Sequence, residues 1–160
     1  MEIGVSFGGT TAFSAAFFQA VFPGFAYHCL DITDRLKLSP MMREKLGIVL
    51  HIPKSSDDLR GTVYDVVFID GDHSYDWARR DFENLGRHAR LVCAFHDISV
   101  REYTPQGGGV FRFWRELRGT ISRTATMLEV CHAVPGPHVP DDGLWMGIGL
   151  IDYTSHHVTI

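Results

Sequence analysis

Basic clusters, long apolar runs and cysteine-rich patterns are all missing from this sequence of 160 residues. Its 15 lysines and arginines are outnumbered by 19 aspartates and glutamates, and no basic run is interleaved with aromatics, which argues against a nucleic-acid or anionic-membrane surface. No apolar run reaches the roughly 18 residues of a membrane span, and no positive segment precedes the apolar stretch 12–25 as in a signal peptide. We therefore expect a soluble, cytoplasmic protein whose partner is a small molecule, with no nucleic acid and no membrane.

Cysteine is scarce as well. The three cysteines, Cys29, Cys93 and Cys131, lie far apart and form no C-x-x-C pair, which is typical of reduced thiols in the cytosol. We interpret all three as packing residues. Internal repeats and long linkers are also absent, so we expect one domain over residues 1–160, with 45% hydrophobic residues to build its core.

Short apolar runs of β-type residues alternate with helix-like stretches, the pattern of a mainly parallel sheet with helices on both faces. Strands of such a sheet are buried on both sides, so their apolar runs are continuous. The predicted strands are Met1–Val5, Phe25–Leu30, Ile48–Ile52, Val63–Ile69, Leu91–Phe95, Met127–Val134 and Trp145–Ile151. Only short Pro/Gly and Asp-Asp-Gly segments separate the last two, which predicts a terminal antiparallel pair.

Three helices are predicted between these strands. From Ser74 to Ala89, apolar residues recur at helical spacing with charged residues on the other face, which indicates an amphipathic helix lying on the sheet. Ser74 is its expected N-cap. The stretches 10–20 and 110–117 are similar, and the first is apolar nearly all round, which predicts a well-buried helix.

Polar and glycine-rich residues follow four of the predicted strands directly. They are the loop Gly4–Thr10 after the first strand, Asp31 after the second, Asp70–His73 after the fourth, and His96 with Asp97 after the fifth. In an open α/β sheet, ligands bind outside the carboxyl ends of the strands. We therefore expect the functional site at this edge of the sheet.

The first of these loops, G-x-S-x-G-G-T, runs into a helix, so its backbone can approach a ligand closely and point free N–H groups at it. Asp31 lies 22 residues beyond Gly9, near the spacing of about 20 at which an acidic residue binds ribose hydroxyls. Together these features predict a nucleoside site, whereas a glycine loop alone also fits a tight structural turn. The departure from G-x-G-x-x-G disfavours a dinucleotide.

Three stretches resemble the class I S-adenosylmethionine-dependent methyltransferases. They are Glu2–Thr10 (E-I-G-V-S-F-G-G-T), Tyr64–Tyr75, which contains F-I-D-G-D-H-S-Y, and Phe95–Ile98 (F-H-D-I). The F-I-D-G-D-H-S-Y signature is the most specific and is typical of a bacterial branch of the family. The resemblance implies a Rossmann-like, doubly wound α/β sheet of seven strands in the order 3-2-1-4-5-7-6, with strand seven antiparallel.

The resemblance also implies S-adenosylmethionine as the cofactor. The residues it assigns to the cofactor are Gly4, Ser6 and Gly8 for the methionine part, Asp31 for the ribose, Ser55, Ser56 and Asp57 for the adenine, and Asp70. The chain departs from the family before Ser55, where it has Pro53-Lys54 in place of the common Gly-Asp.

Related O-methyltransferases of this fold bind a divalent cation at the ends of strands four and five, and Asp70, His96 and Asp97 match those positions. A cation there would bind the acceptor hydroxyl and lower its pKa. Mg²⁺ or Mn²⁺ are the candidate ions, and the histidine fits Mn²⁺, Fe²⁺ or Zn²⁺ better than Mg²⁺. Adjacent strand residues point to opposite faces, so a shared ion requires a turn at residues 96 and 97. The alternative is structural, with Asp70 and Asp72 capping the next helix.

His73 is the candidate general base, with Asp70 as the second catalytic candidate, because histidine titrates near neutral pH. The alternative is that His73 orients a backbone turn.

These features predict transfer of a methyl group from S-adenosylmethionine to an oxygen of a small molecule, with a divalent metal as a possible assistant. The alternatives are a non-catalytic cofactor-binding or interaction domain and another reaction on the same fold. Because the first predicted strand begins at Met1, the helices that usually precede it in this family are expected to be missing. The open cleft would then favour a homo-oligomer.

Overall fold

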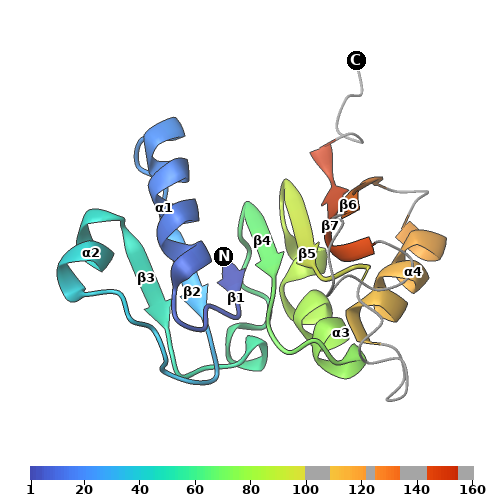
Figure 1. Ribbon diagram of the computed structural model, residues 1–160, viewed down its shortest axis with the longest axis horizontal. Helices are drawn as coiled ribbons and strands as arrows, with labels where there is room; N and C mark the ends of the chain where they lie inside the picture. The colour runs from blue at the N-terminus through green and yellow to red at the C-terminus, as the bar shows by residue number, and fades with distance from the viewer. Residues whose placement is uncertain (100–108, 122–124, 134–143, 155–160) are drawn as a thin grey trace.

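A computed structural model describes residues 1–99, 109–121, 125–133 and 144–154 of the chain. The strands of these ranges form one sheet in the order β3-β2-β1-β4-β5-β7-β6 (Figure 1). They are β1 (Glu2–Ile3), β2 (Tyr27–Leu30), β3 (Ile48–His51), β4 (Val66–Ile69), β5 (Val92–His96), β6 (Thr126–Ala133) and β7 (Leu144–Asp152). Strands β1 to β5 run parallel, and β7 is antiparallel to β5 and β6. The predicted fold class, strand order and terminal antiparallel pair are confirmed.

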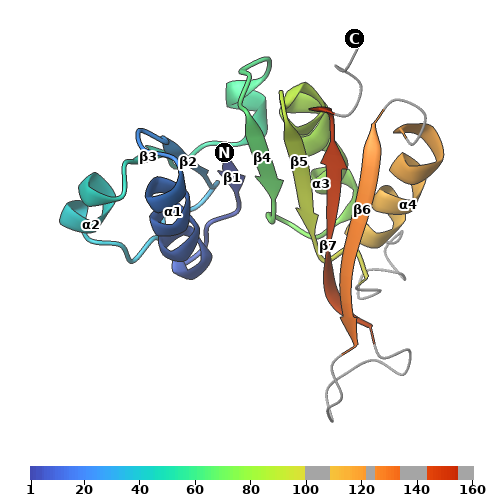
Figure 2. The ribbon, with the colours of Figure 1, turned by 90° about the horizontal axis from the view of Figure 1, so that it is seen from above.

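Helices lie on both faces of the sheet. They are α1 (Gly9–Val21), α2 (Pro40–Lys45), α3 (Tyr75–Asn84) and α4 (Gly109–Ile121), with short 3-10 helices at Ser56–Leu59 and Gly86–His88. Helices α1 and α2 lie beside β1, β2 and β3, whereas α3 and α4 lie on the opposite face near β4 to β7 (Figure 2). The predicted helix after Ser74 is confirmed as α3, but it ends at Asn84, five residues before Ala89. Ser74 occupies the N-cap position, and its side chain makes no capping hydrogen bond.

The two faces carry separate cores. On β2, Cys29 packs with Ala15 of α1, whereas the next residue, Leu30, belongs to the core that contains Phe82 of α3. Neighbouring strand residues point to opposite faces, so consecutive apolar residues of one strand supply both cores. The larger core includes Phe82, Phe95 and Phe113, whose ring centroids are 5.7, 5.9 and 6.0 Å apart.

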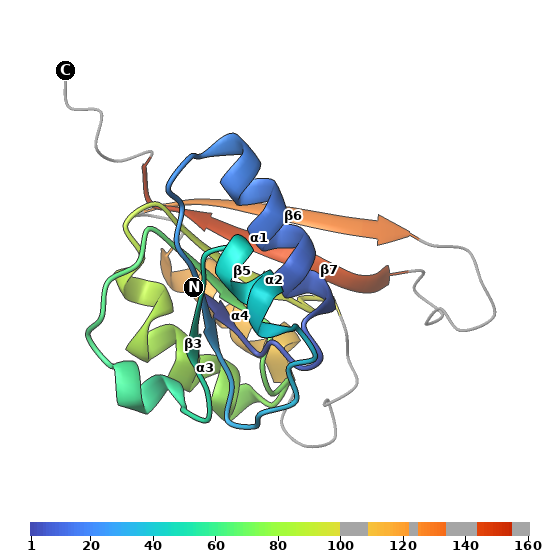
Figure 3. The ribbon, with the colours of Figure 1, turned by 90° about the vertical axis from the view of Figure 1, so that its left-hand side faces the viewer.

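The prediction that the first helix is well buried is wrong. Only Thr11 and Ala15 of α1 are buried, while Phe13 and Phe17 keep 75% and 53% of their surface exposed. One side of α1 packs on the sheet, and Figure 3 shows the helix standing in front of the strands. An apolar helix is therefore covered here on one side only.

Three further details differ from the sequence-based expectations. Helix α2 was not predicted, although Ser39 accepts a hydrogen bond from the Met42 backbone N–H at 3.2 Å and Pro40 occupies the first turn, both recognisable start signals. The fourth strand begins at Val66, three residues later than expected. Cys131 is exposed, so its interpretation as a packing residue is wrong. None of the helices within the described ranges is long and apolar enough for a membrane crossing.

The contact between Gly149 and Trp114 tests the packing of the larger core. A Cβ at residue 149 would come within 2.6 Å of the Trp114 ring, which is 1% exposed. Gly149→Ala is therefore expected to lower the free energy of unfolding by about 1 to 3 kcal/mol. Gly119→Ala in α4 is the matched control, because a Cβ there meets nothing within 4 Å and should raise stability by about 0.5 to 1 kcal/mol. Chemical denaturation measures both, and a fully stable Gly149→Ala variant would contradict the packing.

Candidate active site at the strand ends

The loop after β1 meets the loop after β4 backbone to backbone. Gly4 has a φ of 86°, and a Cβ at this residue would lie 2.2 Å from the carbonyl oxygen of Asp70. Ser6 and Gly8 also have positive φ values, 45° and 87°. Such conformations cost little for glycine and more for serine, so Ser6 is held there by its surroundings. The close approach places both loops at one edge of the sheet.

Asp31, at the end of β2, holds the β1 loop in place. Its Oδ2 accepts hydrogen bonds from the backbone N–H groups of Val5 and Ser6, both at 3.1 Å. Its Oδ1 accepts from the N–H and the hydroxyl of Thr33 at 2.8 and 3.0 Å. A carboxylate has about four lone-pair sites, so the protein itself occupies all of them. Asp31 is thus a structural link between two loops as well as a candidate ligand-binding group.

A cavity of about 270 Å³ opens between these loops. The predicted cofactor residues that line it are Gly4, Ser6, Asp31, Ser55, Ser56 and Asp70. Its apolar walls include Ile32 and Trp77, and Arg35 and Lys54 are the basic residues among its lining. Apolar walls with a few converging polar groups are the usual form of a small-molecule site.

Two of the predicted cofactor residues do not line this cavity. Gly8 precedes α1 as its N-cap, and a Cβ there would contact Leu36 at 2.5 Å. Asp57 forms ion pairs with Arg60 and Arg80. A hydrogen bond from Asn84, helped by these arginines, holds the pKa of Asp57 below its usual value. The side chain of Asp57 is therefore engaged in the neighbouring surface network.

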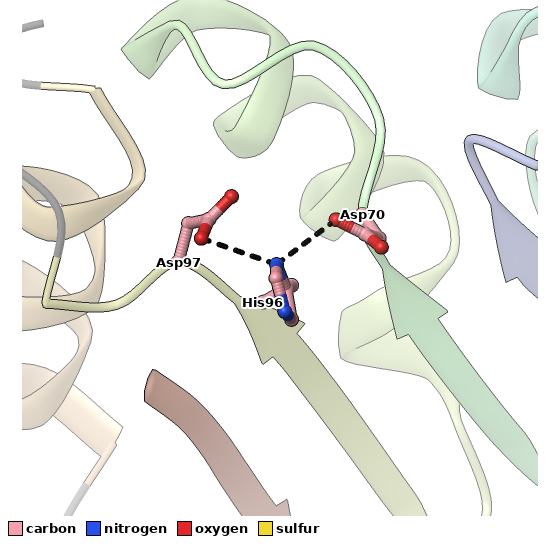
Figure 4. A group of neighbouring side chains, drawn as sticks. All are labelled: Asp70, His96 and Asp97. Carbon is pink, nitrogen blue, oxygen red and sulfur yellow. Dashed lines mark ion pairs between the residues drawn. The ribbon is translucent and has the colours of Figure 1, made fainter. Parts of the chain in front are cut away.

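Asp70, His96 and Asp97 form one cluster at the ends of β4 and β5 (Figure 4). His96 Nδ1 lies 3.3 Å from Asp70 Oδ1 and 3.2 Å from Asp97 Oδ1. Asp97 has a φ of 59°, so the chain turns immediately after His96. This left-handed residue brings two consecutive side chains to the same point, which a continuing strand would prevent.

The cluster has the donor set of a divalent-cation site. One ligand atom from each of the three residues lies within 4.8 Å of the others. His96 Nδ1 is buried, and neither carboxylate meets it with hydrogen-bond geometry, so it has no hydrogen-bond partner in the described part of the chain. A cation among the three groups would give this nitrogen its missing partner. The residues therefore fit a metal ion with mixed nitrogen and oxygen ligands.

The same groups control one another's protonation. The carboxylates of Asp70 and Asp97 raise the pKa of His96 to about 10. Burial alone would raise the pKa of Asp70, but the two histidines outweigh it and hold that pKa below its ordinary value. A metal ion would have to displace the proton from His96, since cation and proton compete for the same nitrogen.

His73 stands beside the cluster, and Asp72 does not join it. His73 Nε2 lies 3.1 Å from Asp97 Oδ2 and 3.8 Å from Asp70 Oδ1, and these carboxylates raise the pKa of His73. Asp72 Oδ1 accepts a hydrogen bond from the Ser74 backbone N–H at 2.9 Å, which shapes the entry into α3. Asp72 therefore has the structural role at the start of the helix that was the alternative for both aspartates, whereas Asp70 faces His73 and His96.

Two buried acids were missed by the sequence reasoning. Glu2 of β1, 1% exposed, accepts a hydrogen bond from the Thr11 hydroxyl at 2.7 Å and so ties α1 to the sheet. Asp81 of α3, 4% exposed, lines the cavity and accepts a hydrogen bond from the Ser56 hydroxyl at 2.6 Å. The sequence did contain one signal for Glu2, because it is the only charged residue in the predicted first strand, Met1–Val5.

Asp81 predicts a pH dependence of stability. Burial raises the pKa of Asp81 from 3.8 to about 6, so the folded state binds this proton more tightly than the unfolded state. Its stabilising contribution is full below about pH 4 and is lost as the pH rises through about 6. Relative to Asp81→Asn, the wild type should lose on the order of 3 kcal/mol of unfolding free energy across that range. Urea unfolding of both proteins checks this, and parallel pH profiles would contradict it.

Comparison with known proteins places these features in a family. Residues 1–98 match a family described as "Methyltransferase domain". An uncharacterized protein of Sinorhizobium fredii, y4gI, is 40% identical over 63 residues, which are 38% of this chain, and the chain spans only 7% of that relative.

Two solved structures share the fold at low sequence identity. An O-methyltransferase from Bacillus cereus in complex with S-adenosylhomocysteine is 16% identical, with a TM-score of 0.63 over 94% of this chain and 72% of its own. MycE, a methyltransferase of mycinamycin biosynthesis in complex with Mg and S-adenosylhomocysteine, is 17% identical, with a TM-score of 0.57 over 94% of this chain and 43% of its own. Because the family match covers 98 of 160 residues, this chain belongs to the family of methyltransferase domains.

Proposed function

We propose that residues 1–160 form one S-adenosylmethionine-binding domain that transfers a methyl group to an oxygen of a small molecule, with a divalent cation at Asp70, His96 and Asp97. The observation that carries the proposal is the position of Asp70, which lines the cavity and also belongs to the cation cluster. A cofactor cavity and a cation site that meet at one residue fit a reaction between two bound partners. Family membership supports this proposal, as do the ligands of the two similar structures.

On the cofactor side, the residues of this chain bind and orient. The cofactor supplies a methyl group activated by its sulfonium sulfur. Gly4 and Ser6 line the cavity next to Asp70, which suits the methionine part. Thr33, whose hydroxyl donates to Asp31, also lines the cavity, so a ribose hydroxyl can replace that donor without leaving Asp31 short of a partner. Ser55 and Ser56, which also line the cavity, are assigned to the adenine of the cofactor.

On the acceptor side, the cluster would place and deprotonate a hydroxyl group. A cation held by Asp70, His96 and Asp97 would lower the pKa of an acceptor hydroxyl bound to it. His73 is the proton acceptor in this proposal, since it stands beside the cluster, and Asp97 Oδ2, 3.1 Å from its Nε2, orients the ring. Asp97 and Asp70 then stabilise the imidazolium that forms. Few other groups are needed, since in-line transfer depends mainly on positioning.

A methyl-transfer assay tests this function. The protein, stripped of metal by a chelator, is given labelled S-adenosylmethionine and a panel of hydroxylated small molecules, with and without Mn²⁺ or Mg²⁺. We expect transfer that depends on the cation and falls about 100-fold or more in Asp97→Asn. Asp65→Asn is the control, because Asp65 is exposed and pairs only with the surface residue Arg90 among the ion pairs of the described chain.

The outcomes separate the parts of the proposal. Transfer that survives the chelator unchanged would remove the cation from the mechanism. Tight binding of the cofactor product without transfer to any acceptor would favour a non-catalytic cofactor-binding domain.

A further inference from the structure

The side of α1 that faces away from the sheet is an apolar stripe. Phe13, Phe17 and Val21, spaced four residues apart, keep 75%, 53% and 50% of their surface exposed. Ala16 and Ala20, also exposed, lie between them on the same side of the helix. No residue of α1 carries a charge. A surface helix normally turns charged residues to the solvent, so an uncharged stripe of this kind marks a contact surface.

A second apolar surface lies on the same side of the molecule as α1. Helices α3 and α4 cover one face of β4 to β7, and the described residues place no helix on the other face of these strands (Figure 2). The strand pairings align two rows of side chains on this bare face. The first row is Phe68, Ala94, Leu150 and Leu128, and the second is His96, Ile148 and Val130. Their chain neighbours Val67, Phe95 and Ile151 point the other way, into the core that contains α3 and α4.

The two rows are most exposed on β6 and β7. Leu128 and Val130 keep 53% and 60% of their surface exposed, and Ile148 keeps 37%. None of the seven residues is an aspartate, glutamate, lysine or arginine. Sheets with parallel strands are normally covered on both faces, so the bare half of this face calls for a cover.

The absence of charge decides between a membrane and a protein as the cover. Amphipathic helices that bind anionic membranes carry lysine and arginine beside their apolar face, and α1 has neither. The apolar stripe and the bare rows therefore fit a protein surface that is itself apolar and uncharged. Each of them offers such a surface to the other.

A two-fold axis brings the two surfaces together. On the face that carries α1, the helix stands over β1 to β3, and the bare rows occupy β4 to β7 (Figure 2). A rotation by 180° about an axis parallel to the strands lays two such faces on each other with their halves exchanged. The helix of each copy then meets the bare rows of the other copy, as a self-complementary interface requires.

The exposed area of the two surfaces is sufficient for a dimer. Taking about 150 to 250 Å² for a whole aromatic side chain, the exposed parts of both surfaces come to roughly 800 Å² per copy. Stable complexes bury about 800 Å² per partner. Either surface alone falls short of that area, so the helix and the rows have to be buried together.

We propose that two copies of this chain form a symmetric dimer in which α1 of each copy packs on the β4–β7 face of the other. The proposal goes beyond the proposed function and does not depend on it. The homo-oligomer expected from the sequence would then form through this face and not through an open cofactor cleft. Because His96 belongs to the second row, the helix of the other copy lies beside the cation cluster.

Sedimentation velocity on the full chain, without cofactor or metal, tests the dimer. We expect the wild type to dimerise with a Kd of about micromolar or tighter. Phe17→Asp and Leu128→Arg should each raise that Kd about 100-fold or more, because the symmetry places each change in the interface twice. Val49→Asp is the control and should keep the wild-type Kd. Val49 is 40% exposed, but its neighbours Ile48 and Leu50 pack toward α1, so Val49 points to the opposite face.

A mixture of the two disrupted variants separates this arrangement from other dimers. In a dimer of one Phe17→Asp copy and one Leu128→Arg copy, one contact between helix and sheet is unchanged. The other contact brings opposite charges together. The mixture should therefore dimerise although neither variant does so alone, and both variants should keep the wild-type circular dichroism spectrum because the changed residues are exposed.

Each outcome bears on the dimer alone. A wild type that stays monomeric at every concentration overturns the proposal without the need for a variant. A dimer that survives Phe17→Asp or Leu128→Arg unchanged shows that the copies meet elsewhere, and a mixture that stays monomeric overturns the reciprocal contact between helix and sheet. None of these results touches the proposed function, because cofactor and metal are absent from the measurement.

Discussion

Residue 4 has to be a glycine because the backbone of β1 passes so close to the backbone of β4 that a Cβ there would lie 2.2 Å from the Asp70 carbonyl oxygen. The parallel register pairs Ile3 with Ile69, and the Asp70 N–H donates to the Ile3 carbonyl at 2.9 Å. This contact places the loop that approaches a cofactor against the carboxylate that would bind a cation. The cavity and the cluster therefore share one wall, and the proposed chemistry depends on that closeness.

The left-handed turn at Asp97 is the second constraint on the site. With a φ of 59°, Asp97 adopts a conformation that few residues other than glycine, asparagine and aspartate tolerate. It aims the carboxylate back at His96, whose Nδ1 is buried and has no hydrogen-bond partner in the described chain. A left-handed residue beside a buried nitrogen that has ion pairs but no aligned hydrogen bond is typical of a functional site. If residue 97 served packing alone, an ordinary strand conformation would be more stable than this left-handed one.

The sequence predicted the sheet and its strand ends because those features leave local traces. The run Val66–Ile69 is continuously apolar, since one of its faces is buried and the other is partly buried. Helix α3 shows its buried stripe at helical spacing. Contacts that depend on distant elements leave no such trace. Phe13 of α1 looks the same in a sequence whether it is covered or exposed, and Asp57 could be placed near the cavity by its position in the chain but not aimed into it. Asp81 resembles any charged residue of an amphipathic helix until α3 is placed against Ser56.

The central claim is that the cavity and the cation cluster act together through Asp70. The most direct measurement is anomalous diffraction from crystals of the protein grown with Mn²⁺ and S-adenosylhomocysteine. The account predicts one manganese peak bound by Asp70, His96 and Asp97, with the product in the cavity and its sulfur toward Asp70. Manganese bound elsewhere, or a product molecule lying with its purine at the cluster, would contradict it.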